Sequence, residues 1–284
     1  MKEAARQARA DSHLVGLVPT MGALHEGHLS LVRRAKKECS RVYASIFVNP
    51  KQFGVNEDFA KYPRTFESDS ARFAELGVDA LFAPTAEEVY PSGFSTYVSV
   101  EAISERLEGR SRPGHFRGVS TVVLKLFEIV QPDFAYFGRK DAQQTSVIQR
   151  MVRDLSLNVQ IVVCPIVREP DGLALSSRNA YLNSEERRAA TVLHRSLQAA
   201  RAELTRGVRD SLELRSAMRA VFEKEPLARL DYVEIVSADN FEPVERVLRA
   251  SYVLVAATLG KTRLIDNMLI EPARSDSGEL LFHL

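Results

Sequence analysis

The stretch over residues 15–32 constrains this chain most, because its character changes within a few residues. A short apolar run over 15–18 is typical of a buried strand. From Gly27 onward, apolar residues recur at helical spacing: Leu29, Val32 and Ala35. The stretch therefore predicts a strand, a tight loop and a helix. Gly22 and Gly27 would let the loop backbone approach a ligand closely, and the N–H groups and dipole of the helix start suit a phosphate.

Two familiar phosphate-binding motifs do not fit the sequence. The spacing of Gly22 and Gly27 matches a P-loop, but the next residues are His28 and Leu29, where a P-loop needs Lys and then Ser or Thr. The run Gly260–Thr262 has Lys and Thr, but Val255 stands where the first glycine belongs. No G-x-G-x-x-G occurs, so the dinucleotide fingerprint is excluded as well.

The loop carries His-x-Gly-His instead, made by His25, Gly27 and His28. This resembles the signature of the class I aminoacyl-tRNA synthetases and their nucleotidyltransferase relatives, where the histidines contact ATP phosphates. Two other interpretations are open: a surface loop with two unrelated histidines, or a pair of histidines that bind a metal ion. Zinc would need further ligands, and the chain has no Cys-x-x-Cys and four other histidines: His13, His115, His194 and His283.

Composition limits the function classes. A chain of 284 residues with 45% hydrophobic content suits two domains or one large one. A net charge of +1 gives no global electrostatic case for nucleic acid. Cys39 and Cys164 lie in or beside apolar runs, which predicts small buried residues in a reducing compartment. Residues 1–9 are polar, and no apolar run could span a bilayer, so we expect a soluble cytoplasmic protein without a membrane partner.

Alternating strand and helix patterns predict an α/β fold with a Rossmann-like parallel sheet, its strands at residues 15–18, 41–48, 79–82, 134–137 and 159–163. From Ser184, an expected N-cap, we predict a long helix to about Thr205, a second helix over 211–224, and strands over 230–236, 252–257 and 262–270. We therefore expect a larger domain built on the parallel sheet over 1–177 and a smaller α+β domain over 178–284. We predict that residues 54–66 form either a mobile lid loop or a plain surface loop.

Five stretches in this order resemble the pantothenate synthetase (pantoate–β-alanine ligase) family. They cover most of residues 14–182: Pro19–Gly22 with His25 and His28; Phe47–Pro50 with Gln52–Phe53; Arg112–Phe116; Phe137–Gly138 with Lys140–Asp141 and Gln143–Gln144; and Asp171–Leu173 with Ser176–Asn179. The chain departs from the family pattern at Leu175, where Met is common, and at Arg139, where Glu or Gln is commoner.

The resemblance implies a ligase that joins pantoate to β-alanine with ATP, by way of a pantoyl adenylate, and releases AMP and pyrophosphate. It also implies a homodimer, a catalytic domain over 1–177 that binds ATP and pantoate, and a lid role for residues 178–284. We expect Mg²⁺ to be held mainly by the ATP phosphates, without a protein metal site, since the sequence shows no all-carboxylate cage. Physically, the protein must position two negative groups and neutralise their charge.

The resemblance also implies site residues. The catalytic candidates are His25, His28, Lys140 and Arg178. The ATP-binding candidates are Met21, Gly22, His25, Gly27, His28, Gly138, Lys140, Asp141, Val167, Leu175, Ser176, Ser177 and Arg178. The candidates for pantoate and β-alanine are Gln52, Gln144, Asn49 and Arg112. Arg112 is equally well explained as an anion clamp or as a salt bridge that stabilises its loop.

Three rival functions stay open at this point. Another nucleotidyltransferase of the superfamily would have the His-x-Gly-His loop without needing Gln52 and Gln144. A non-catalytic nucleotide-binding relative should have lost some of the catalytic candidates, and all four are present. A tRNA-binding synthetase fragment should have a basic face, which the net charge does not support.

Overall fold

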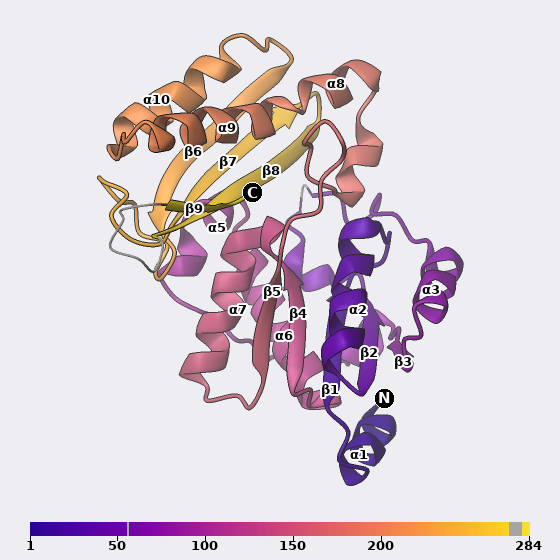
Figure 1. Cartoon of the computed structure of the whole chain (residues 1–284). Helices are drawn as coiled ribbons and strands as arrows, with labels where there is room; N and C mark the ends of the chain where they lie inside the picture. The colour runs from indigo at the N-terminus through magenta and orange to yellow at the C-terminus, as the bar shows by residue number, and fades with distance from the viewer. Residues whose placement is uncertain (56, 273–279) are drawn as a thin grey trace. The chain divides into compact units, whose positions relative to one another are not determined.

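The computed structural model describes residues 1–55, 57–272 and 280–284, and its contacts divide the chain into two compact units (Figure 1). The first unit is Met1–Arg139 with Gln143–Cys164, and the second is Lys140–Ala142 with Pro165–Leu284. The predicted parallel α/β sheet and separate smaller α+β unit are both confirmed. The domain division at residue 177 and the lid role of the C-terminal part stay predictions.

The first unit is built on a five-stranded parallel sheet in the order β3-β2-β1-β4-β5. Its first strand pairs with both β2 and β4, so the strand order reverses there. In open α/β sheets this reversal opens a crevice at the carboxyl ends of the strands. The strands are β1 (Val15–Thr20), β2 (Arg41–Ile46), β3 (Ala80–Phe82), β4 (Phe134–Gly138) and β5 (Gln160–Cys164).

Helices pack against this sheet and connect its strands (Figure 1). The helix after the His-x-Gly-His loop buries Val32 and Ala35, as the sequence pattern predicted, and Leu31 in addition. Leu29, the third predicted position, is half-buried against the same core. A helix at the N-terminus, which the sequence did not predict, buries Ala5 and Ala8. The helices are α1 (Lys2–Ala10), α2 (Glu26–Glu38), η1 (Pro50–Gln52), α3 (Phe66–Glu75), α4 (Ala86–Val89), η2 (Ile103–Glu105), α5 (Glu108–Ser111), α6 (His115–Val130), η3 (Arg139–Asp141) and α7 (Ala142–Asp154).

Both cysteines are buried in the core between sheet and helices, as predicted. The Cys39 thiol lies 3.3 Å from the hydroxyl of Tyr136, which is itself fully buried. Gly16 on β1 faces this pair, and a Cβ there would lie 2.8 Å from the Cys39 sulfur. The α2–β1 packing therefore requires a glycine at this position.

The second unit contains an antiparallel sheet in the order β6-β7-β8-β9, covered by two helices (Figure 1). Its last strand, β9, was not predicted. The elements are η4 (Ser177–Tyr181), α8 (Ser184–Ala189), α9 (Val192–Thr205), α10 (Ser211–Phe222), β6 (Ala228–Ser237), β7 (Ser251–Leu259), β8 (Thr262–Pro272) and β9 (Leu280–His283). Within the described ranges, no helix combines the length and apolar character needed to cross a membrane.

Two details of the predicted long helix are wrong. The N-cap is Asn183, whose side-chain oxygen accepts the N–H groups of Glu185 and Glu186 at 2.9 Å each. The helix is also interrupted after α8, where the Thr191 hydroxyl donates to the Arg188 carbonyl at 2.8 Å. A threonine side chain that bonds back to the preceding turn competes with the helical ladder and favours such a break.

Candidate functional site

The carboxyl ends of three neighbouring parallel strands carry most of the first unit's predicted site residues. The loop after β1 leads to His25 and His28, the loop after β2 leads to Gln52, and β4 is followed by the segment that reaches Gln144. Because β1 lies between β2 and β4 in register, these loops leave the sheet at one edge. The topology therefore gathers residues that are far apart in the sequence.

A buried carboxylate holds the loop after β1. The side chain of Asp69, 2% exposed, accepts the N–H groups of Ala23 and Leu24 at 2.9 Å each and the Thr65 hydroxyl at 2.9 Å. Gly22 adopts φ +82°, a conformation that favours glycine. The sequence analysis missed Asp69, because it lies more than forty residues from the loop and no local motif marks it.

The two histidines of the loop cap helix α2 reciprocally. The Gly27 N–H donates to His25 Nδ1 at 3.1 Å, and the His25 N–H donates to His28 Nδ1 at 3.3 Å. A neutral imidazole that accepts at Nδ1 carries its proton on Nε2, so each ring has an Nε2–H donor. The ring centroids lie 4.1 Å apart. A Cβ on Gly27 would lie 2.8 Å from the His25 ring, so this glycine makes room for the cap.

A pocket of about 330 Å³ lies beside this loop, within the first unit. Met21 and Gly22 form one wall, and the residues after β2 and the segment 63–66 form others. Most of the residues that line it are apolar. The lining residues are Met21, Gly22, Ile46, Phe47, Val48, Phe59, Pro63, Arg64, Thr65, Phe66, Asp69, Ala83, Pro84 and Ala86. Of the predicted ATP-binding residues, Met21 and Gly22 border this pocket.

Gln52 sits in a closely packed turn after β2. Its side-chain oxygen accepts from Asn49 Nδ2 at 3.0 Å, and its Nε2 lies 3.0 Å from the Met21 sulfur. Asn49, 1% exposed, also donates to the Gly118 carbonyl and accepts from the Tyr90 hydroxyl. Because both the nitrogen and the oxygen of its side-chain amide are already hydrogen-bonded within the protein, the geometry favours a role for Asn49 in holding Gln52 in place.

Arg112, predicted to be either an anion clamp or part of a salt bridge, forms side-chain contacts within the first unit. Its guanidinium contacts the Glu57 carboxylate at 2.9 and 2.6 Å. It also donates to His115 Nε2 at 3.0 Å, while His115 Nδ1 donates to the Gln52 carbonyl at 2.8 Å. The geometry thus favours the salt-bridge interpretation of Arg112, as part of a network that fixes the backbone of Gln52.

Burial of His115 beside Arg112 makes protein stability depend on pH. Burial, and then the neighbouring Arg112 charge, lower the pKa of His115 to about 4. The unfolded chain, with an ordinary pKa near 6.5, binds a proton below that pH that the folded chain does not bind until about pH 4. The free energy of unfolding should therefore fall as the pH falls, by ~2 kcal/mol between pH 7.5 and pH 5 from this histidine.

Urea unfolding of His115→Gln at both pH values checks this expectation. The variant should be less stable than the wild type at pH 7.5 and should lose about 2 kcal/mol less between the two values. His13→Gln, outside this cluster, controls for the removal of a histidine and should keep the wild-type slope. Equal slopes for the His115→Gln chain and the wild type would contradict the expectation.

The adjacent residues Gln143 and Gln144 differ sharply. The Gln143 side chain is buried and bonds to the Glu108 N–H and to the carbonyls of Ile103 and Arg106 at 2.7–3.1 Å. Gln144 is half-buried, and its amide has no hydrogen-bond partner among residues 1–55, 57–272 and 280–284. Gln143 is therefore structural, whereas the amide of Gln144 is available to a ligand.

The other predicted ATP-binding residues belong to the second unit, apart from Gly138 at the end of β4. Val167 and Leu175 face each other in a hairpin, where the Leu175 N–H donates to the Val167 carbonyl at 3.0 Å. Ser176 then caps η4, accepting the Arg178 N–H at 3.3 Å. Within η4 lie Ser177 and Arg178, both half-buried.

Lys140 and Asp141 complete the predicted set. The Lys140 side chain is 19% exposed, and its ammonium lies 3.9 Å from the Asp141 carboxylate, which is 50% exposed. The Lys140 main-chain carbonyl accepts a hydrogen bond from Asn267 at 2.9 Å. Among the residues that the structure describes, no group of three or more His, Cys, Asp or Glu could hold a metal ion.

A parallel sheet with a His-x-Gly-His loop at its switch point defines a nucleotide-binding protein of the Rossmann-like class. A family model described as pantoate–β-alanine ligase matches residues 1–269. The pantothenate synthetase of Acidobacterium capsulatum is 59% identical over 256 residues, which cover 90% of this chain and 86% of that protein. The chain therefore belongs to the pantoate–β-alanine ligase family.

Solved structures agree with this assignment. The crystal structure of pantothenate synthetase from Thermus thermophilus has a TM-score of 0.88 and 49% identity, covering 93% of this chain and 96% of that one. A pantoate–β-alanine ligase from Francisella tularensis, crystallised as a complex with β-γ ATP and β-alanine, has a TM-score of 0.74 and 37% identity. It covers 94% of each chain.

Proposed function

We propose that this chain is an amide-forming ligase that condenses pantoate with β-alanine, using ATP, to give pantothenate, AMP and pyrophosphate. The observation that carries the proposal is the convergence of the His25–His28 loop and the Gln52 turn at one edge of the parallel sheet. Membership of the family supports the same reaction. A generic nucleotidyltransferase would need the histidine loop but not Gln52 or Gln144.

In the first step, a pantoate carboxylate oxygen attacks the α-phosphorus of ATP. The new P–O bond forms as the bond between the α- and β-phosphoryl groups breaks, and pyrophosphate leaves with the electron pair. Negative charge grows on the phosphoryl oxygens, and donors already aimed at them lower the barrier. We assign this role to the Nε2–H groups of His25 and His28 and to the cationic side chains of Lys140 and Arg178.

In the second step, the β-alanine amine attacks the acyl carbon of pantoyl adenylate. The C–N bond forms, the C–O bond to AMP breaks, and the amine loses a proton. We assign Gln52 and Gln144 to pantoate, with Gln52 also near β-alanine, because an amide can both donate to a carboxylate and accept from a hydroxyl. Asn49 and Arg112 serve this site by holding Gln52 and its backbone.

ATP would contact the loop after β1 and the segments around Lys140 and Ser176. We assign it to Met21, Gly22, Gly27, Gly138, Asp141, Val167, Leu175, Ser176 and Ser177, besides the catalytic residues. Mg²⁺ would enter with the ATP substrate, bound mainly through its phosphates, as is usual for this ion in ATP-dependent enzymes. The family resemblance also supports a homodimer, a cytoplasmic location and a lid role for residues 178–284.

An isotope experiment tests the proposed chemistry. Pantoate labelled with heavy oxygen in its carboxylate should transfer one labelled oxygen to AMP, because the C–O bond of the adenylate breaks in the second step. Mass spectrometry of the products measures the transfer, and a reaction without β-alanine should release pyrophosphate but little AMP. Label found in the pyrophosphate would contradict attack at the α-phosphorus.

A further inference from the structure

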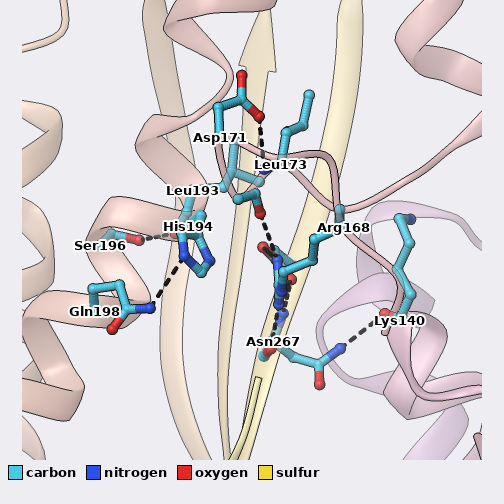
Figure 2. Close-up of polar contacts among 12 residues, drawn as sticks. Lys140, Arg168, Asp171, Leu173, Leu193, His194, Ser196, Gln198 and Asn267 are labelled. Carbon is cyan, nitrogen blue, oxygen red and sulfur yellow. Dashed lines mark hydrogen bonds and ion pairs between the residues drawn. The ribbon is translucent and has the colours of Figure 1, made fainter. Parts of the chain in front are cut away.

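Lys140 follows strand β4 of the first unit, yet Lys140–Ala142 group with the second unit. One hydrogen bond joins the main chain of Lys140 to strand β8 of that unit. Asn267, on strand β8, donates from Nδ2 to the Lys140 main-chain carbonyl at 2.9 Å, and Figure 2 shows its amide directed at that carbonyl. Asn267 is 1% exposed, so the donor end of this bond is shielded from water. Shielding makes the loss of such a bond costly.

The strand that carries Asn267 is fixed by a buried ion pair. Its neighbour Asp266, 2% exposed, accepts two bonds from the Arg168 guanidinium at 2.7 and 2.9 Å. The same carboxylate accepts the Asn267 N–H at 2.8 Å. Asn267 is paired with Leu254 of β7, and β8 pairs with β9 on its other side from Leu269 onward. Asn267 therefore stands on a part of the sheet whose backbone is held from several directions.

From this geometry we infer that Asn267 is a positioning residue for Lys140. The inference rests on the proposed role of Lys140 in adenylate formation. A lysine ammonium is carried on a flexible four-carbon stem, so its reach depends on where the main chain is anchored. A displacement of about 1 Å at a catalytic group can cost roughly 100-fold in rate. Asn267 anchors the carbonyl of the residue whose ammonium must meet the phosphates.

The test uses a double-mutant cycle on the full chain. Asn267→Ala should lower the rate of pantoate-dependent pyrophosphate release by about 10- to 100-fold under saturating substrates. In the Lys140→Ala background the same change should lower the rate by less than about 3-fold, because the group that it positions is already gone. Met268→Ala, the next residue on β8, removes a fully buried side chain that makes no bond to Lys140.

Met268→Ala controls for a loss of stability alone. It should lower the unfolding temperature and keep the rate within about 3-fold of the wild type, when assayed well below that temperature. Equal losses from Asn267→Ala in the wild-type and Lys140→Ala backgrounds would overturn the inference. A wild-type rate for Lys140→Ala would overturn both the Lys140 assignment and this inference. AMP release by the unmodified chain that requires both pantoate and β-alanine tests the proposed reaction independently of either result.

Discussion

Replacing His28 with alanine should slow pantoyl-adenylate formation by about 100- to 1,000-fold, the usual cost of removing one transition-state donor. The imidazole accepts the His25 N–H at Nδ1, so its Nε2–H is the atom that can donate to the α-phosphoryl oxygens. Rapid-quench measurement of pantoate-dependent pyrophosphate release gives the rate of this step. Lys140→Ala should show a loss of the same order, because it removes a positive charge from the same developing anion.

Two conservative variants separate catalysis by His28 from its capping of α2. In His28→Asn the side-chain oxygen can replace Nδ1 as acceptor, so the cap should survive while adenylate formation stays slow. In His28→Gln the amide can reach the Nε2 position, so part of the rate should return while stability falls by about 1 kcal/mol through the lost cap. Pyrophosphate release near the wild-type rate in His28→Ala would contradict the assignment.

Gln52→Ala and Gln144→Ala should weaken pantoate binding strongly and leave ATP binding nearly intact. Truncating either amide leaves polar groups of bound pantoate without a partner, at a cost of ~1–3 kcal/mol, or about 5- to 150-fold in affinity. Gln52→Ala should also slow the β-alanine step, and Gln144→Ala should do so less. Isothermal titration with ATP and pantoate kinetics measure the two effects separately.

The neighbouring glutamine supplies a matched control for this prediction. Gln143→Ala removes bonds to the Glu108 N–H and to two backbone carbonyls, so it should cost stability. Gln144→Ala breaks no bond within the described chain, so its unfolding temperature should stay near the wild type. Lost ATP affinity with unchanged pantoate saturation in both Gln52→Ala and Gln144→Ala would place the pantoate pocket elsewhere.

Much of this protein could be predicted from local sequence. The apolar run before Thr20 and the helical spacing after Gly27 determined the strand–loop–helix unit, because side-chain periodicity decides which face can be buried. Strand and helix alternation then determined the parallel sheet, and the order of short motifs indicated the ligase family. Sequence alone also identified the glycine at position 27, although its physical reason, space for the His25 ring, appears in the structure.

Other features were decided by contacts between distant residues, which periodicity does not encode. The loop before His25 depends on the carboxylate of Asp69, and the Gln52 turn depends on Asn49 and His115. Sequence could not tell Gln143 from Gln144, because both follow the same strand and only their packing differs. Lys140 could be identified by its motif, but its anchor, Asn267, lies more than a hundred residues away and meets it through the folding of the second unit. Local sequence thus determined which elements form, while tertiary packing decided which side chains support the site and which are left to act in it.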